Sequence, residues 1–172
     1  MPSDTPHILA EEGDVRVILA TPNDAQSVLA LQDLLFPGDP NALPADRFGD
    51  VIAHEANTVL VARRNDAVLG FLVLRDRGLR PWTGVDFVGV APEAQGKGVG
   101  ALLVKAGCKA ARRPVIRLFV HPDNHRAQSL YTRLGFRQTG TRKDNYADGA
   151  DAIIMMKWLG PRSFRRDRDR KE

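Results

Sequence analysis

The residues best suited to chemistry are three alternating glycines, Gly96, Gly98 and Gly100, with Lys97 between the first two. A strand-like apolar run precedes them and a run with helical spacing follows, so a helix begins within the glycines. Glycine in a helical turn costs about 0.5–1 kcal/mol relative to alanine, and the usual benefit is that a ligand can approach the backbone closely. Unpaired N–H groups at a helix N-terminus bind anions. The pattern therefore predicts that Gly96–Ala101 holds a phosphate or diphosphate through main-chain donors.

Two familiar phosphate-binding patterns fit these glycines poorly. The nucleoside-triphosphate loop requires glycine five residues before a Gly-Lys pair and Ser or Thr after it, but Ala91 and Gly98 occupy those positions. The dinucleotide fingerprint follows a first strand and has an acidic residue about 20 residues further on. Gly96 follows a late strand, and no acidic residue stands at that spacing.

A second constellation runs from Asn124 through Tyr131 to Gly135. Its apolar spacing predicts a helix over 124–134 that ends at the glycine. Tyr131 lies on the apolar stripe, where it either packs in the core or offers its hydroxyl to a site. Asn124 can cap the helix, contact a ligand, or do both.

Few side chains could accept a proton near these motifs. His121 lies at a strand end near the expected cleft, and histidine titrates near neutral pH. His121 and His125 are four residues apart, but Pro122 disrupts a helix there and no third ligand is evident, so no metal site is expected.

The elements that position these residues follow a mixed order that predicts one α/β (α+β) domain over residues 15–160. The two runs on either side of Asn65 form an antiparallel hairpin, and proline after residue 91 ends the strand before the glycines. The expected strands cover 15–19, 58–63, 67–75, 85–90, 115–120, 136–139 and 150–158, and the expected helices 21–35, 44–55, 98–111 and 124–134.

Two motifs on these elements resemble the GNAT family of N-acetyltransferases. Gln95-x-x-Gly98-x-Gly100, preceded by Val88-x-Val90-x-Pro92, is similar to the family's acetyl-CoA loop, and the segment 124–136 is similar to its second motif. The order of elements over about Val15–Trp158 is similar too, with the closest likeness to ribosomal-protein alanine and protein N-terminal acetyltransferases. The resemblance implies a mostly antiparallel sheet of about seven strands flanked by about four helices. It also implies direct transfer of an acetyl group from acetyl-CoA to a primary amine.

The resemblance also implies residue roles. The strand before the glycines pairs with the pantetheine arm like an added strand, the helix start holds the diphosphate, and the Tyr131 hydroxyl protonates the departing thiolate. The implied cofactor-binding residues are Val88, Gly89, Val90, Gln95, Gly96, Lys97, Gly98, Val99, Gly100, Ala101, Asn124 and Tyr131.

The sequence departs from the family at the general base. The family's other location for it is a carboxylate on the strand before the glycines, which makes Asp86 a candidate, with a structural role as the alternative, beside His121. Phe119 stands where the ribosomal-protein alanine acetyltransferases carry a glutamate. An α-amine, with a pKa near 7.7–8.0, needs less help losing its proton than a lysine amine near 10.4. The segment 142–146 also resembles N-terminal acetyltransferases, in which the residue matching Tyr146 walls the acceptor site. A protein N-terminal amine is therefore the expected acceptor, with a polyamine, aminoglycoside or amino-acid amine, or a non-catalytic acyl-CoA-binding module, as alternatives.

Composition limits the remaining classes. The chain has 172 residues, 43% of them hydrophobic and 27% charged, which suits one packed domain. The single cysteine, Cys108, cannot form an internal disulfide. No signal-like start and no apolar run of about 20 residues is present, so a cytoplasmic protein without a membrane partner is expected, as a monomer or a homodimer.

Charge is concentrated at one end. Residues 161–172 hold six of the 25 basic and three of the 21 acidic residues, which leaves 19 and 18 elsewhere. We therefore expect a nearly neutral domain with a basic disordered tail, a flexible start over residues 1–14, and no specific nucleic-acid partner.

Overall fold

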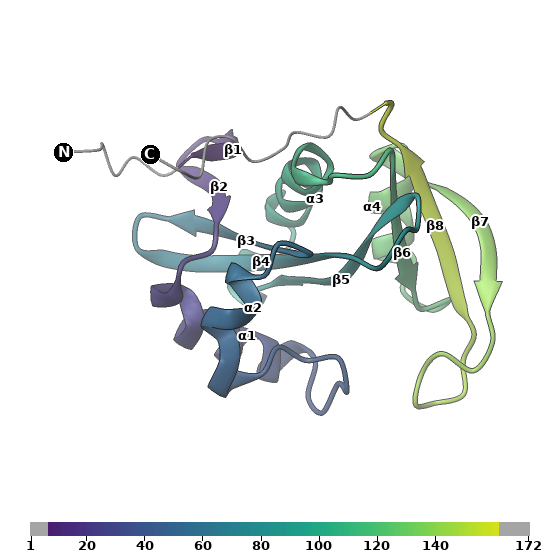
Figure 1. The fold of residues 1–172 in the computed structure, drawn as a ribbon, viewed down its shortest axis with the longest axis horizontal. Coiled ribbons are helices and arrows are strands. Elements are labelled where there is room, and N and C mark those ends of the chain that lie inside the picture. Colours follow the sequence, from purple (N-terminus) through teal and green to yellow (C-terminus); the bar gives the residue numbers. More distant parts are fainter. Residues whose placement is uncertain (1–6, 162–172) are drawn as a thin grey trace.

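The computed structural model describes residues 7–161 and contains one eight-stranded sheet with the strand order β1-β2-β3-β4-β5-β6-β8-β7 (Figure 1). All neighbouring strands are antiparallel except β5 and β6. The expected mixed, mostly antiparallel α/β fold is therefore confirmed, with one strand more than expected. The strands are β1 (Ile8–Glu12), β2 (Val15–Leu19), β3 (Asn57–Arg64), β4 (Ala67–Asp76), β5 (Trp82–Val90), β6 (Val115–Val120), β7 (Arg137–Arg142) and β8 (Ala152–Trp158).

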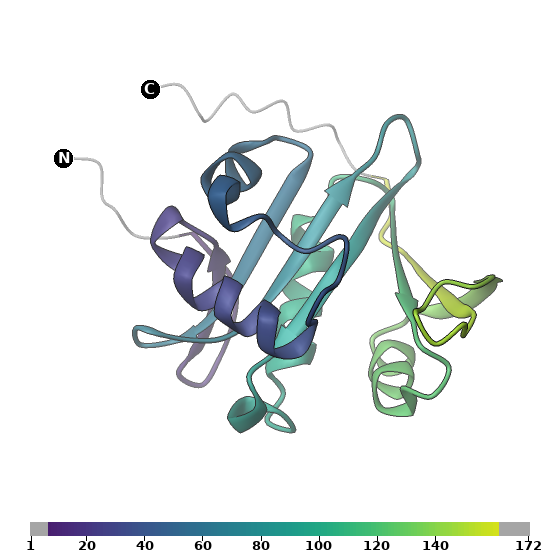
Figure 2. The same ribbon diagram turned by 90° about the horizontal axis from the view of Figure 1, so that it is seen from below.

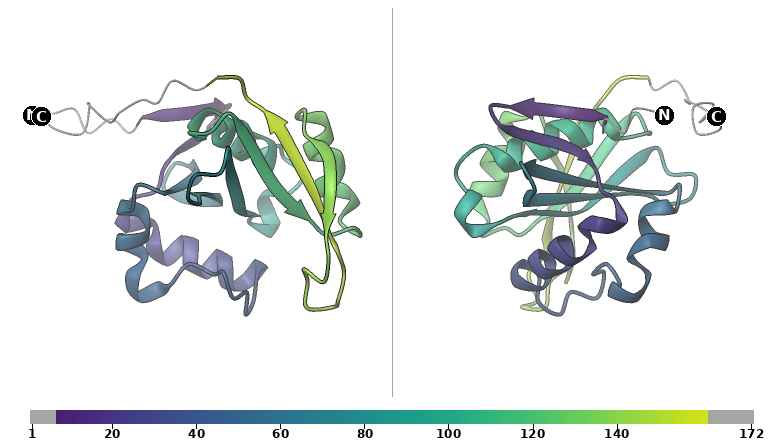
Figure 3. Two further views of the ribbon diagram at one scale, coloured as in Figure 1. Left: turned by 45° about the vertical axis from the view of Figure 1, so that its right-hand side comes forward. Right: turned by 90° about the vertical axis from the view of Figure 1, so that its left-hand side faces the viewer.

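Helices cover both faces of this sheet. α1 packs on one face against β4 and β5, and α3 packs on the other against β3 and β4 (Figure 2, Figure 3). Side-chain alternation along β4 explains this arrangement, because Phe71 lies beside Leu35 of α1 while the next residue, Leu72, lies beside Gly107 of α3. The helices are α1 (Ala25–Leu35), α2 (Phe48–Ala53), α3 (Val99–Ala110) and α4 (His125–Arg133), with short 3-10 turns η1 (Pro22–Asp24), η2 (Ala45–Arg47) and η3 (Pro92–Ala94).

The core lies around the central strands. The run from Phe71 to Leu74 is at most 1% exposed, because both faces of β4 are covered. Phe36, just after α1, packs against Phe71 and Phe87 with ring centroids 6.3 and 5.1 Å away. This aromatic cluster fixes the α1 side of β4 and β5, the strand on which the predicted site depends.

Several elements differ from the sequence predictions. The expected flexible start contains β1, which pairs with β2 and receives a hydrogen bond from Lys109 of α3 to the Leu9 carbonyl. The second helix is shorter than expected, because η2 replaces its first turn and His54 leaves helical geometry. β7 runs to Arg142, beyond the expected 136–139. Most of the predicted basic tail lies outside the described residues.

Within residues 7–161, no helix combines the length and the apolar character that crossing a membrane requires.

Candidate active site

The site is built on a fork between β5 and β6. Their parallel pairing begins at Trp82–Val115 and stops at Val85–Leu118. Beyond that point β5 stays paired with β4, and β6 with β8, so the two strands separate (Figure 2). Asp86 is skipped in the β4–β5 register, which marks a bulge that bends β5 at the fork.

The fork leaves one backbone edge of β5 open. Among the described strands, none pairs with the side of Val88–Val90 that faces β6. The Gln95 side chain donates a hydrogen bond to the Val90 carbonyl at 3.1 Å and so fixes the turn after β5. Gly89 is small for packing reasons, since a Cβ there would lie 2.7 Å from Phe71 Cε1. An extended, amide-bearing chain could add itself along this open edge.

The glycine turn lies at the end of the same strand. Gly98 is the N-cap of α3 in the left-handed region, with φ 84°, and Gly96 has φ 75°. No side chain caps α3, so the N–H groups of its first turn point outward without a partner inside the helix. Arg126 Nη2, from α4, lies 3.3 Å from where a Cβ on Gly96 would stand. Two cations, Lys97 and Arg126, thus accompany the main-chain donors, an arrangement that suits an anionic ligand.

Tyr131 lies on α4, next to this helix start. Its neighbour Leu130 and Val90 of β5 are both in van der Waals range of Gly100, which brings α4, β5 and α3 together. Tyr131 is 8% exposed and its ring packs against Phe136 with centroids 5.7 Å apart. Burial raises the pKa of Tyr131 to about 12, with a smaller contribution from Tyr146. The phenol therefore keeps its proton throughout the physiological pH range.

Asn124 begins α4. Its Oδ1 accepts a hydrogen bond from the Ala127 backbone N–H at 3.1 Å, which is the capping role that the sequence allows. The cap does not engage the NH2 group of the Asn124 amide, so this group could still contact the cofactor. That contact stays a prediction.

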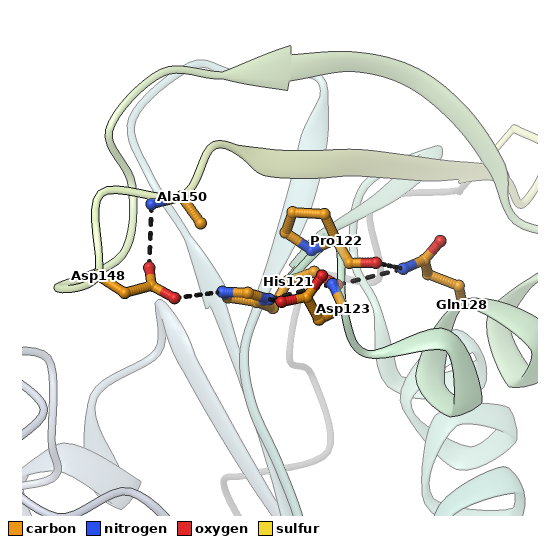
Figure 4. Close-up of polar contacts among 6 residues, drawn as sticks. All are labelled: His121, Pro122, Asp123, Gln128, Asp148 and Ala150. Carbon is orange, nitrogen blue, oxygen red and sulfur yellow. Dashed lines mark hydrogen bonds and ion pairs between the residues drawn. The ribbon is translucent and has the colours of Figure 1, made fainter.

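His121 joins the end of β6 to the loop between β7 and β8 (Figure 4). Its Nε2 lies 2.8 Å from Asp148 Oδ2, and its Nδ1 accepts the Asp123 backbone N–H at 3.1 Å. The neutral ring must therefore carry its hydrogen on Nε2 and donate it to the carboxylate. The Ala150 N–H and, next, His121 lower the pKa of Asp148, so this carboxylate is charged near neutral pH.

Tyr146 belongs to the same loop. Its ring centroid is 4.8 Å from that of His121, and burial raises the pKa of its phenol. The other side of His121 is held by Gln128 of α4, whose amide donates to the His121 and Pro122 carbonyls at 3.2 and 2.7 Å. Figure 4 shows the contacts that run from Asp148 in the loop through His121 to Gln128 of α4. Tyr146 packs on the His121 ring, beside the end of β6.

Comparison with known proteins decides the family. The model of the acetyltransferase (GNAT) family matches residues 26–136, which include the fork, the glycine turn and Tyr131. The chain belongs to this family. It is an acetyl-CoA-dependent N-acetyltransferase, and acetyl-CoA is the co-substrate that a diphosphate site and an open strand edge suit.

Named relatives agree with this assignment. The chain is 33% identical over 154 residues to the N-alpha-acetyltransferase RimI of Mycobacterium tuberculosis, covering 88% of this chain and 97% of that protein. The crystal structure of the Escherichia coli ribosomal-protein-S18-alanine N-acetyltransferase has TM-score 0.69 at 19% identity, covering 87% of this chain and 96% of that one. The Salmonella typhimurium protein yncA, solved with acetyl-CoA, has TM-score 0.71 at 18% identity over 88% and 97%. At these identities the two structures support the fold.

Neither position at which the family resemblance places a general base carries a free carboxylate. Phe119, which the resemblance matches to a glutamate, has its ring beneath the guanidinium of Arg117, 4.8 Å away. Asp86 forms ion pairs with Arg75 at 3.0 Å and Arg77 at 2.9 Å. Burial raises the pKa of Asp86, and the two arginines offset only part of that rise. Asp86 thus lies within a network that supports the bulge.

Two groups that the fold brings to the site are not among the residues predicted from the sequence. Arg126 stands four residues before Leu130, so helical spacing alone could have placed it on the face towards the glycine turn. Asp148 is 27 residues from His121, and no local pattern marks this contact. No cluster of three potential metal ligands forms within residues 7–161.

Proposed function

We propose that this N-acetyltransferase acts on the N-terminal α-amine of a peptide or protein. The observation that carries the proposal is that each of the three candidate positions for a general base in the described residues is apolar or engaged. Phe119 replaces the glutamate, Asp86 pairs with two arginines, and both ring nitrogens of His121 are hydrogen-bonded. An α-amine with a pKa of about 7.7–8.0 is partly neutral at pH 7.5 and can lose its proton to water. The name of the M. tuberculosis relative gives further support.

The cofactor is assigned to the fork and the helix start. The pantetheine arm lies along Val88–Val90 as an added strand, and the N–H groups of Gly98–Ala101 bind the diphosphate. Lys97 and Arg126 add positive charge beside it. Asn124 offers its amide to the arm while its oxygen caps α4.

The transfer is a direct attack. The neutral amine nitrogen forms a bond to the thioester carbonyl carbon, the C–S bond breaks, and the amine proton passes to water. Tyr131 donates a hydrogen bond to the departing thiolate and recovers any proton it gives from solvent. Because its pKa of about 12 exceeds that of a thiol, about 8.5, complete transfer is uphill, so the phenol acts chiefly by stabilising developing charge.

His121 and Asp148 are assigned a positioning role. Together they hold Tyr146 as one wall of the acceptor site, and neither nitrogen of the ring is free to take the amine proton in this arrangement. Asp86 is assigned a structural role at the bulge.

An acceptor panel tests the proposal. Purified protein and acetyl-CoA are combined with peptides bearing a free N-terminus, the same peptides blocked at the N-terminus but containing lysine, and polyamines, aminoglycosides and free amino acids. Release of free thiol is followed, and mass spectrometry locates the acetyl group. The proposal expects turnover with free N-termini and little with blocked lysine peptides. Preferred turnover of lysine or of a small amine would refute it, and binding of acetyl-CoA without turnover of any amine would indicate a non-catalytic module.

A further inference from the structure

A row of stacked cations and aromatic rings lies beside the fork, formed by Arg80, Trp82, Arg117, Phe119 and Arg142; we call it the arginine–aromatic ladder. The Arg117 guanidinium lies 4.8 Å from both the Trp82 and the Phe119 ring centroids. Arg80 covers Trp82 at 5.4 Å and Arg142 covers Phe119 at 5.6 Å. Stacking of this kind fixes the plane of each guanidinium and leaves its N–H edges available to a ligand.

The three arginines of the ladder have no carboxylate partner within residues 7–161. The ion pairs found there do not include any of them, and the nearby carboxylate of Asp86 is held by two other arginines. The Nε of Arg117 is buried and has no hydrogen-bond partner. Burial, together with Arg80 and Arg142, lowers the pKa of Arg117. Three like charges held together in this way favour binding of an anion.

The ladder lies on the opposite side of the sheet from the glycine turn's helix. A Cβ on Gly84, the β5 partner of Arg117, would lie beside Asp86 Oδ1. The charge of Asp39, which follows α1, contributes to the raised pKa of Asp86, so Asp86 lies near α1. This is the α1 side, whereas α3 and its anion-binding start belong to the other face. The cofactor diphosphate is therefore not the anion that the ladder matches.

The ladder is within reach of an acceptor bound at the fork. Arg117 and Phe119 occupy alternate positions on β6, and His121, beside Tyr146, follows at the next alternate position. At about 3.3 Å per residue, Arg117 lies about 13 Å back along the strand from His121. An extended peptide that has its amine at the end of β6 and runs back along this strand would bring its second to fourth residues alongside the ladder.

We propose that the arginine–aromatic ladder binds a carboxylate side chain of the acceptor, so that this enzyme prefers peptides with Asp or Glu at positions two to four. The inference rests on the proposed function, since it assumes a peptide acceptor. A planar carboxylate matches the paired N–H groups of a guanidinium and can bind in a bidentate way. Arg117 contacts a ring on either side, which limits how far its guanidinium can turn, and the exposed Arg80 and Arg142 flank it.

The test compares matched peptides. Three synthetic peptides share an N-terminal alanine and differ only at positions two to four, which carry Glu, Gln or Lys. Thiol release gives kcat/KM for each at low and at high salt. We expect kcat/KM for the Glu peptide to exceed that for the Gln peptide by at least about tenfold, because hydrogen bonds to charged groups are stronger than neutral ones. The preference should shrink at high salt, because exposed charges are screened.

Variants locate the preference. Arg117→Met keeps an unbranched chain between the two rings, and Arg142→Gln removes an exposed charge. Each should lower kcat/KM for the Glu peptide at least about fivefold and change that for the Gln peptide less than about twofold. Lys105→Gln, at an exposed position on α3, is the matched control and should leave the preference intact. Thermal melting checks that Arg117→Met folds. If it does not, Arg142→Gln, at an exposed position, tests by itself whether the ladder binds the acidic side chain.

The outcomes separate the two proposals. The inference fails while the proposed function stands if peptides are acetylated at rates independent of the charge at positions two to four. It also fails if both arginine variants keep the full preference for Glu, because the ladder then does not bind the acidic side chain. If no free N-terminus is acetylated but small amines are, the proposed function fails and the inference fails with it.

Discussion

Replacing Gly98 with alanine tests whether the glycine turn binds a ligand or only turns the chain. Gly98 has φ 84°, and a Cβ there would meet no atom within 4 Å. The cost of alanine is therefore backbone strain alone, about 1–2 kcal/mol. For a domain of this size that corresponds to a fall in Tm of roughly 2–8 °C.

The effect on the cofactor should be larger than this strain. If the alanine relaxes towards negative φ, the N–H groups at the start of α3 turn away from the diphosphate. The loss of one hydrogen bond to a charged group costs about 1.5–3 kcal/mol, which is roughly a tenfold to hundredfold rise in Kd for coenzyme A. Isothermal titration calorimetry with coenzyme A measures this directly.

Gly100→Ala is the matched control two residues away. Its Cβ would lie 3.6 Å from Val90 Cγ2 and 3.7 Å from Leu130 Cδ2, which are ordinary contacts, and its φ is not in the left-handed region. Alanine should stabilise α3 by about 0.5–1 kcal/mol and keep the first-turn N–H groups in place, so its effect on the affinity for coenzyme A should be much smaller than that of Gly98→Ala. If Gly98→Ala lowers Tm but binds coenzyme A as tightly as the unmodified chain, the turn is structural only and the diphosphate lies elsewhere.

Three further predictions concern the reacting end of the site. Tyr131→Phe should lower kcat at least about tenfold while KM for acetyl-CoA holds, in steady-state assays, because it removes a donor to developing charge; an unchanged kcat would remove the phenol from the mechanism. The same variant should alter alkaline stability: the folded pKa of Tyr131 is raised from 10.0 to about 12, so the stability held below pH 10 is lost as pH rises towards 12, by about 2–3 kcal/mol. Urea unfolding at pH 9 and pH 11.5 should show that additional loss in the unmodified chain and not in Tyr131→Phe, and equal losses would contradict the burial argument. Asp148→Asn should raise KM for the peptide roughly threefold to tenfold without changing KM for acetyl-CoA, because it weakens the His121 hydrogen bond that positions Tyr146. Steady-state kinetics with each substrate varied separately measure both constants, and a rise in KM for acetyl-CoA alone would contradict this role.

The fold could be predicted from the sequence where local periodicity and packing agree. The third helix and the hairpin of β3 and β4 were expected within about two residues of where they lie, because their apolar spacing is strong and glycine, asparagine or proline marks their ends. β1 was not expected, because Glu11, Glu12 and Gly13 give it a polar, turn-like composition. Its pairing with β2 and its contact with α3 are tertiary interactions.

The candidate site divides in the same way. The glycine turn and Tyr131 belong to contiguous motifs, so sequence was enough to name them, although their catalytic and binding roles remain predictions. The hydrogen bonds of His121 join residues far apart in the chain, and only the fold shows that both ring nitrogens are engaged. The arginine–aromatic ladder is likewise invisible in sequence, because Trp82, Arg117 and Arg142 come from three different strands.

The first strand gives the catalytic domain an earlier boundary than its hydrophobic pattern suggests. Glu12 and Val15 line a small cavity together with Lys97 and Gly98, so the N-terminal hairpin abuts the very turn that is assigned the diphosphate. A protein shortened to begin at Val15 would lose more than an outer strand. The glycine turn would be uncovered on one flank, and, if it binds the diphosphate as proposed, trimming this end would weaken the binding of acetyl-CoA.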